Sequence, residues 1–216
     1  MTESTTMEAP PARIGAASIA VEDDPIPIVR LLARTLRDAS ARVPDATAGL
    51  EGTVVVRSHD TPQAATLEFA HEVVKVSAGA LRDPGATVTV DLNARFAPSQ
   101  EPVGDAGLAA GVLRALRPPL PHWRDAAARF WEVTRDIPGI PDILVVDADG
   151  PDGVEHGRYG EGATSYLVAG SADILAGVFS GADDFLASLA AGVRVQGTLS
   201  QLSVMTAASW RVRFDV

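Results

Sequence analysis

The stretch SADILAGVFSGADDFLASLAAGVRVQG, residues 171–197, carries the clearest structural signals of this chain. Ser171 is a typical N-cap residue, and large apolar side chains follow it at helical spacing. Gly181 predicts the end of that helix, and the aspartates after it can cap a second helix that ends at Gly192. Residues 193–196 then alternate apolar and polar, as a half-buried strand does. The stretch therefore predicts two short helices that lead into a strand on a sheet.

This arrangement resembles the C-terminal part of the sterol carrier protein type 2 family. In that family a strand leads to a helix that ends in glycine, then to a short helix, and then to the pattern Gly-apolar-x-apolar-x-Gly. The matching residues here are 166–168, 171–181, 183–191 and 192–197. The resemblance implies an α+β fold in which helices cover a twisted, mainly antiparallel sheet. The rest of the chain matches the family only loosely.

The same resemblance implies a function: the binding or carriage of a sterol, fatty acyl chain or related lipid, without catalysis. The ligand would lie in an apolar tunnel between the sheet and the two helices. Each methylene moved from water into such a tunnel contributes about 0.8 kcal/mol. Ordinary core residues would occupy the same positions. The candidate ligand-binding residues are Val88, Val90, Leu167, Ile174, Val178, Phe179, Phe185, Leu186 and Leu189.

Two parts of different character make up the chain. Residues 1–24 are rich in Thr, Glu, Pro and Ala and predict a disordered tail, because they offer few large apolar groups for burial. Residues 25–216 are expected to form one domain of the sterol carrier type. A short Gly-Ala-Thr similarity leaves open that this domain is elongated or consists of two similar halves, 25–120 and 121–216.

Apolar periodicity predicts further elements. A helix that opens near Pro25 carries Ile and Leu on one face and Arg30, Arg34 and Arg37 on the other, and we expect these arginines to be solvated. Residues 52–92 predict a β-meander. Further helices are expected from Asp105 to Leu116, at 121–135 and at 200–208, and further strands at 143–146, 154–159, 164–168 and 210–214.

Composition excludes several classes of partner and site. The net charge of the 216-residue chain is −10, which argues against a nucleic-acid partner. The absence of cysteine excludes disulfides, thiolate metal sites and a cysteine nucleophile. The N-terminus lacks the features of a signal peptide, and no apolar run is long enough to span a membrane, so the cytoplasm is the expected location.

Sequence motifs for catalysis are weak. Ser58, His59 and Asp60 have the residue types of a catalytic triad, but adjacent side chains of an extended segment point to opposite sides. The four histidines show no metal-binding spacing, and the acidic segment 147–153 departs from a calcium loop at its essential glycine and glutamate. We therefore predict no catalytic residue, no metal ligand and no cofactor.

Three functions remain open from the sequence. The first is a soluble carrier of a hydrophobic ligand, which predicts an apolar pocket. The second is a non-catalytic accessory or assembly module with a filled core, which predicts a protein partner and an exposed apolar patch. The third is an enzyme whose catalytic groups meet only in space, which predicts titratable groups with perturbed pKa values in a cleft. The first is preferred.

Overall fold

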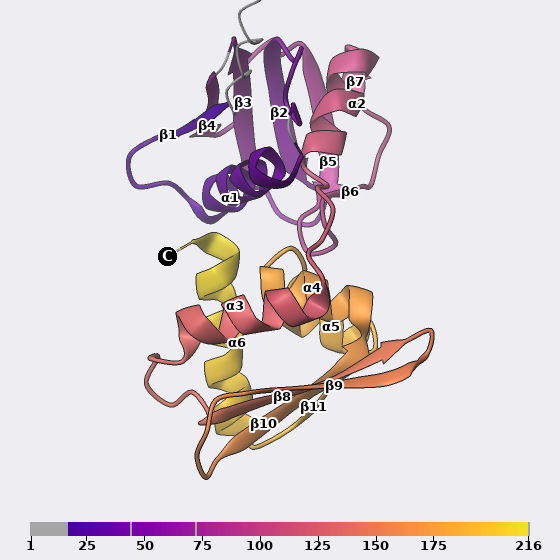
Figure 1. The fold of residues 1–216 in the computed structure, drawn as a ribbon. Coiled ribbons are helices and arrows are strands. Elements are labelled where there is room, and N and C mark those ends of the chain that lie inside the picture. Colours follow the sequence, from indigo (N-terminus) through magenta and orange to yellow (C-terminus); the bar gives the residue numbers. More distant parts are fainter. Residues whose placement is uncertain (1–16, 44, 72, 216) are drawn as a thin grey trace, which may run out of the picture.

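The computed structural model describes residues 17–43, 45–71 and 73–215. Its fold is α+β, with 35% helix and 31% strand, as the sequence predicts. The chain builds two layered units, each with one sheet, helices on one face of that sheet and a hydrophobic core between them (Figure 1). We call residues 17–116 the N-lobe and residues 123–215 the C-lobe. A duplicated origin of the two halves stays a prediction.

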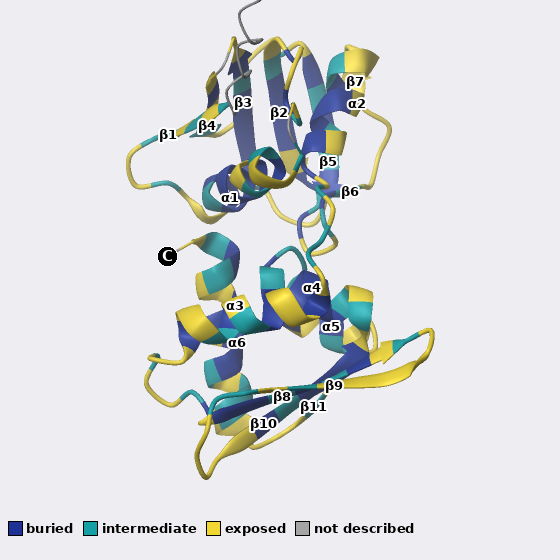
Figure 2. Ribbon diagram, viewed as in Figure 1, coloured by how far each residue is buried: buried dark blue, intermediate teal, exposed yellow. Residues whose placement is uncertain are grey.

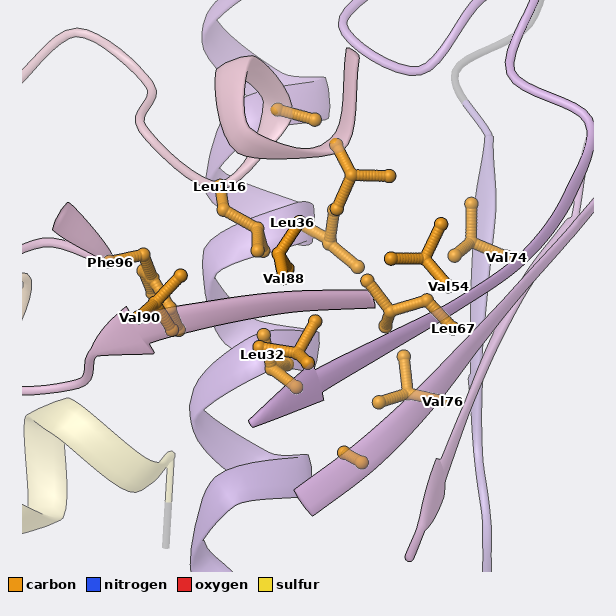
Figure 3. Packing of buried hydrophobic residues seen from close by; sticks show 14 of the residues in the cluster. Leu32, Leu36, Val54, Leu67, Val74, Val76, Val88, Val90, Phe96 and Leu116 are labelled. Carbon is orange, nitrogen blue, oxygen red and sulfur yellow. The ribbon is translucent and has the colours of Figure 1, made fainter. Parts of the chain in front are cut away.

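The N-lobe contains a sheet with strand order β1-β4-β3-β2-β5-β6, and β7 pairs with β5. Helices α1 (Pro27–Arg42) and α2 (Ala106–Ala115) cover one face, and their leucine and valine side chains meet those of the strands (Figure 3). The strands are β1 (Ser18–Val21), β2 (Gly52–Ser58), β3 (Ala64–Ala70), β4 (Val73–Ala78), β5 (Ala86–Asp91), β6 (Ala97–Pro98) and β7 (Val103–Gly104).

The predicted meander is correct for its first three strands and wrong for the fourth. Strands β2, β3 and β4 pair antiparallel in sequence order, but β5 returns to the other side of β2 and pairs with it in parallel. The apolar alternation of β5 would be the same next to β4, as a meander requires, or next to β2, as observed. The sequence pattern therefore could not distinguish the two pairings. The prediction of a disordered tail over residues 1–24 is wrong for Ser18–Val21, which pairs in parallel with β4; residues 1–16 lie outside the described part.

The C-lobe contains a four-stranded sheet of order β11-β10-β8-β9, in which β8 and β10 are parallel. Helices α3 and α4 contact its strands, whereas α5 and α6 pack mainly against other helices, and the buried residues of this lobe lie on its helices and central strands (Figure 2). The elements are α3 (Trp123–Thr134), β8 (Ile143–Gly150), β9 (Gly153–Tyr159), β10 (Ser165–Ser171), α4 (Ala172–Ser180), α5 (Phe185–Ala190), β11 (Arg194–Gln196) and α6 (Leu199–Phe214).

Residues 171–197 fold into the two helices and the strand that their sequence predicts. The Ser171 hydroxyl accepts the N–H of Ile174 and caps α4, and Gly181 ends this helix in the left-handed conformation, with φ of 74°. The carboxylate of Asp184 accepts the N–H of Ala187 at 2.9 Å and caps α5. The chain then enters β11, which pairs antiparallel with β10.

The predicted C-terminal strand at 210–214 is wrong, because α6 runs unbroken through these residues to Phe214. A capping box between Thr198 and Gln201 starts this helix. The sequence after Ala208 alternates aromatic or apolar residues with arginine, which imitates a strand. The structure instead buries Arg213 and leaves Trp210 exposed, so the apolar alternation does not mark the inward face.

Tyr166 is a buried residue of the C-lobe core whose hydroxyl has no hydrogen-bond partner among the described residues. Burial raises the pKa of its phenol from 10.0 to about 12. Between these two pH values the unfolded chain releases the proton while the folded chain keeps it. This group therefore makes the protein less stable as the pH rises through that window.

We expect Tyr166→Phe to keep or raise the free energy of unfolding at pH 7, by up to about 1 kcal/mol, because it removes an unpaired buried hydroxyl. The loss of stability between pH 10 and pH 12 should become smaller. Urea unfolding at pH 7 and in this alkaline window measures both effects. Tyr159→Phe is the control, since the Tyr159 hydroxyl donates to the Arg124 carbonyl at 3.1 Å. A Tyr166→Phe protein destabilised as much as the control would contradict the assignment.

An arginine-lined cleft as the candidate functional site

The two lobes meet where α1 of the N-lobe faces the end of α4 and the C-terminal part of α6 (Figure 1). The chain passes from one lobe to the other through residues 117–122, which contain Pro118, Pro119 and Pro121. Two buried arginines, one from each lobe, occupy the contact. Arg34 also lines the cleft between the lobes.

Arg213 of α6 is only 2% exposed. Its guanidinium donates to the carbonyls of Gly181 and Ala182 at 3.0 Å each, and to the carbonyl of Leu92 in the N-lobe. Burial lowers the pKa of this guanidinium from 12.5 to about 10. The carbonyls that it binds include the C-terminal end of α4, where the helix dipole is negative and stabilises a cation.

Arg34 of α1 reaches the same point from the N-lobe. It is 8% exposed and donates to the carbonyls of Ser180 at 2.7 Å and Gly181 at 3.0 Å, and to the Asp38 carboxylate at 2.9 Å. The sequence pattern placed Arg34 on a solvated helix face, which is wrong. The Gly181 carbonyl thus accepts from both buried guanidiniums. The Arg34 Nε, also buried, has no partner among the described residues.

A third contact comes from the segment that follows β5. Arg95 binds the Asp183 carboxylate, with Nε at 2.8 Å and a terminal nitrogen at 2.6 Å, and it pairs with Asp173 at 2.9 Å. Arg95 and Phe96 both have left-handed backbones, with φ of 50° and 54°. Two consecutive non-glycine residues in this region are strained, and such strain often accompanies a functional site.

Two adjoining hollows open between the lobes. The smaller one has a volume of about 230 Å³ and the larger one about 500 Å³, and both are lined by Arg34, Asp38, Arg42 and Ser180. Apolar side chains of Phe96, Leu116 and Leu120 line the smaller hollow. Arginines from three helices line the larger one: Arg34, Arg37 and Arg42 of α1, Arg129 of α3 and Arg211 of α6.

The cleft is basic although the chain is acidic. Seven arginines and four aspartates line the two hollows, while the net charge of the whole chain is −10. Arg37 pairs with Asp215 at 3.2 Å, but Arg42, Arg129 and Arg211 have no carboxylate within 4 Å in the described part of the chain. The cleft can therefore offer free guanidinium donors to an anion.

The structure does not gather the nine predicted ligand-binding residues at one site. Val88 and Val90 point into the N-lobe core under α1 (Figure 3), whereas Val178, Phe179 and Phe185 are buried in the C-lobe core. Ile174 and Leu189 pack at the edge of that second core, Leu167 is half-buried, and Leu186 is 44% exposed. Phe179 alone among the nine lines either of the two hollows.

The helix–sheet space where we expected a tunnel contains packed side chains. The rings of Phe130 and Phe179 lie 5.3 Å apart, and Leu175, Val178 and Phe185 belong to the same buried cluster. A ligand role for the predicted residues stays a prediction. Sequence reasoning missed the cleft because its arginines come from distant helices.

The residues that the sequence offers for catalysis or metal binding can be placed in the described ranges. The Ser58 hydroxyl bonds directly to Asp60 at 2.5 Å rather than to His59, so the three residues do not form a triad. No three His, Asp or Glu side chains of residues 17–43, 45–71 and 73–215 form a metal-ligand set. No helix in these ranges has the length and apolar character to cross a bilayer.

Arg213→Met tests the buried contact between the lobes. The substitution removes the donor to the carbonyls of Ala182 and Leu92 and leaves the Gly181 carbonyl with Arg34 alone, so we expect the free energy of unfolding to fall by about 3 kcal/mol. Arg211→Gln, on the same helix but exposed, should change it by less than about 0.5 kcal/mol. Urea unfolding of both variants measures the difference. Equal stabilities would show that Arg213 does not hold the lobes together.

The chain was compared with known proteins at three levels. No model of a protein family, no curated protein and no solved structure matches it. The resemblance to the sterol carrier protein type 2 family therefore stays a prediction, and the geometry of the cleft is the basis for a functional proposal.

Proposed function

We propose that this protein binds a small amphiphilic anion, without catalysing a reaction, in the cleft between its lobes. The observation that carries the proposal is the composition of the smaller hollow. Its wall joins apolar side chains, among them Phe96 and Leu120, to the guanidiniums of Arg34 and Arg42. A ligand with an apolar body and an anionic end matches both parts.

The apolar side of the hollow would supply most of the affinity. Phe96 and Leu116 belong to the N-lobe core, and Leu120, Pro118 and Pro119 come from the connecting segment. Each ligand methylene buried there contributes about 0.8 kcal/mol. Ligand sites in proteins commonly combine such an apolar wall with a few polar groups that fix the orientation. The ligand class thus agrees with the hydrophobic ligand that the family resemblance implies, at a different site.

The polar groups of the smaller hollow favour binding over catalysis. The Thr35 hydroxyl donates to the Leu31 carbonyl at 2.8 Å, and the Ser180 hydroxyl donates to the Gly177 carbonyl at 3.2 Å. The carboxylates of Asp38 and Asp173 pair with arginines. A nucleophile needs a free base beside it, and these groups are held in structural contacts instead.

A series of straight-chain carboxylates, from hexanoate to decanoate, tests the proposal by isothermal titration calorimetry. The affinity should rise roughly four-fold with each added methylene, because each one buries further apolar surface. Ala182 lines the smaller hollow, and Ala182→Phe should abolish this binding by filling the space. Ala187→Phe, which adds the same ring at an exposed position of α5, is the matched control.

The result that would overturn the proposal is equally clear. An affinity that does not depend on chain length would mean that no apolar body enters the hollow. Equal binding by Ala182→Phe and Ala187→Phe would place the ligand elsewhere. Both variants should keep the unfolding midpoint of the parent protein closely enough for their titrations to be compared.

A further inference from the structure

We propose that the larger hollow binds a doubly charged phosphate group, so that the preferred ligand is an amphiphile with a phosphate monoester end. This inference rests on the proposed function, because it names the anionic end of the same ligand. The two hollows share Arg34, Asp38, Arg42 and Ser180 in their linings, so the arginine-rich space lies next to the apolar wall, and the proposed ligand would reach both.

The charge of the larger hollow matches a dianion better than a single carboxylate. Five arginines and three aspartates line it, which leaves a formal charge of +2. A phosphate monoester carries about −1.5 to −2 at pH 7, and its oxygens accept hydrogen bonds on several sides. A carboxylate carries −1 and presents two oxygens in one plane. The site would therefore be neutralised by a phosphate and left positive by a carboxylate.

The arginines of the larger hollow come from several helices rather than from one. Arg42 belongs to α1, Arg129 to α3 and Arg211 to α6, so the guanidiniums come from three helices of the two lobes. None of the three has a carboxylate within 4 Å in the described part of the chain. Guanidiniums bind phosphate oxygens through paired N–H donors, and donors on several sides suit its tetrahedral shape.

A second observation concerns the buried wall between the two hollows. Arg34 is almost completely buried and lines both of them. Its terminal nitrogens bind Asp38 and the end of α4, while its buried Nε has no partner among the described residues. Solvent screens the charge of so deeply buried an arginine only weakly, so an anion in either hollow is attracted to it more strongly than to an exposed arginine.

The aspartates of this hollow do not cancel the effect. Asp38 pairs with Arg34, and Asp215 pairs with Arg37. Asp125 lines the hollow without a cation within 4 Å in the described residues, although it lies one helical turn before Arg129. The aspartates thus neutralise two of the five arginines directly and leave Arg42, Arg129 and Arg211 without a carboxylate partner, although Arg42 also donates to the Pro119 carbonyl at 3.0 Å.

The test compares decyl phosphate with decanoate by isothermal titration calorimetry at low ionic strength. The parent protein should bind decyl phosphate about ten-fold tighter or more, because its greater charge and additional oxygens allow more charge-assisted hydrogen bonds than a carboxylate makes. In the double variant Arg129→Gln/Arg211→Gln this preference should fall below about three-fold. Arg135→Gln/Arg158→Gln removes the same charge from exposed positions outside both hollows and should keep the full preference.

The outcomes separate this inference from the proposed function. If chain length governs the affinity but decyl phosphate and decanoate bind equally, the phosphate site is refuted and the amphiphile site stands. If the two double variants lose the preference equally, a general charge effect explains it and the inference fails. If the preference is lost only in Arg129→Gln/Arg211→Gln, the arginine-rich hollow is the phosphate site.

Two sources could supply this phosphate end, and sedimentation with vesicles distinguishes them. Vesicles of phosphatidylcholine with phosphatidic acid present the group in a membrane, and vesicles of phosphatidylcholine alone lack it. Binding to the first kind that is lost in Arg129→Gln/Arg211→Gln supports a lipid source. Binding of decyl phosphate without any binding to vesicles supports a soluble phosphate ester. Failure of both to bind would overturn the inference.

Discussion

Two guanidiniums share the carbonyl of Gly181, and the relative placement of the lobes follows from this contact. Arg34 comes from α1 of the N-lobe and Arg213 from α6 of the C-lobe, and both are buried. The carbonyls at the end of α4 compensate the desolvation of these charges, because the negative end of the helix dipole lies there. Residues of the same helices, α1, α4 and α6, line the cleft. This contact therefore determines both how the lobes are placed and where the candidate site lies.

Local signals explain why parts of the fold follow from the sequence. Ser171, Gly181 and Asp184 act on backbone groups within a few residues, so their roles can be recognised without knowledge of the rest of the chain. The apolar face of α1 is equally local, and Leu32 and Leu36 are buried as its spacing predicts. The sequence therefore predicts the helices and most strands well.

Long-range contacts explain what the sequence does not predict. Arg34 is separated from the carbonyl of Gly181 by 147 residues, and no helical spacing reports such a partner. Arg213 belongs to an alternation that imitates a strand, and its burial depends on carbonyls just after α4 that this pattern does not report. The nine predicted ligand residues were chosen for being apolar, which selects two separate cores. The cleft depends on charged residues that this criterion leaves out.

The connection between the lobes has a consequence for ligand affinity. Pro118, Pro119 and Pro121 restrict the backbone of the short segment that joins them, and Arg42 donates to the Pro119 carbonyl at 3.0 Å. A stiff connection leaves the lobes little rotational freedom to lose when a molecule enters. The entropic cost of association should then fall mainly on the ligand, and preorganisation of this kind allows even a small contact area to give useful affinity.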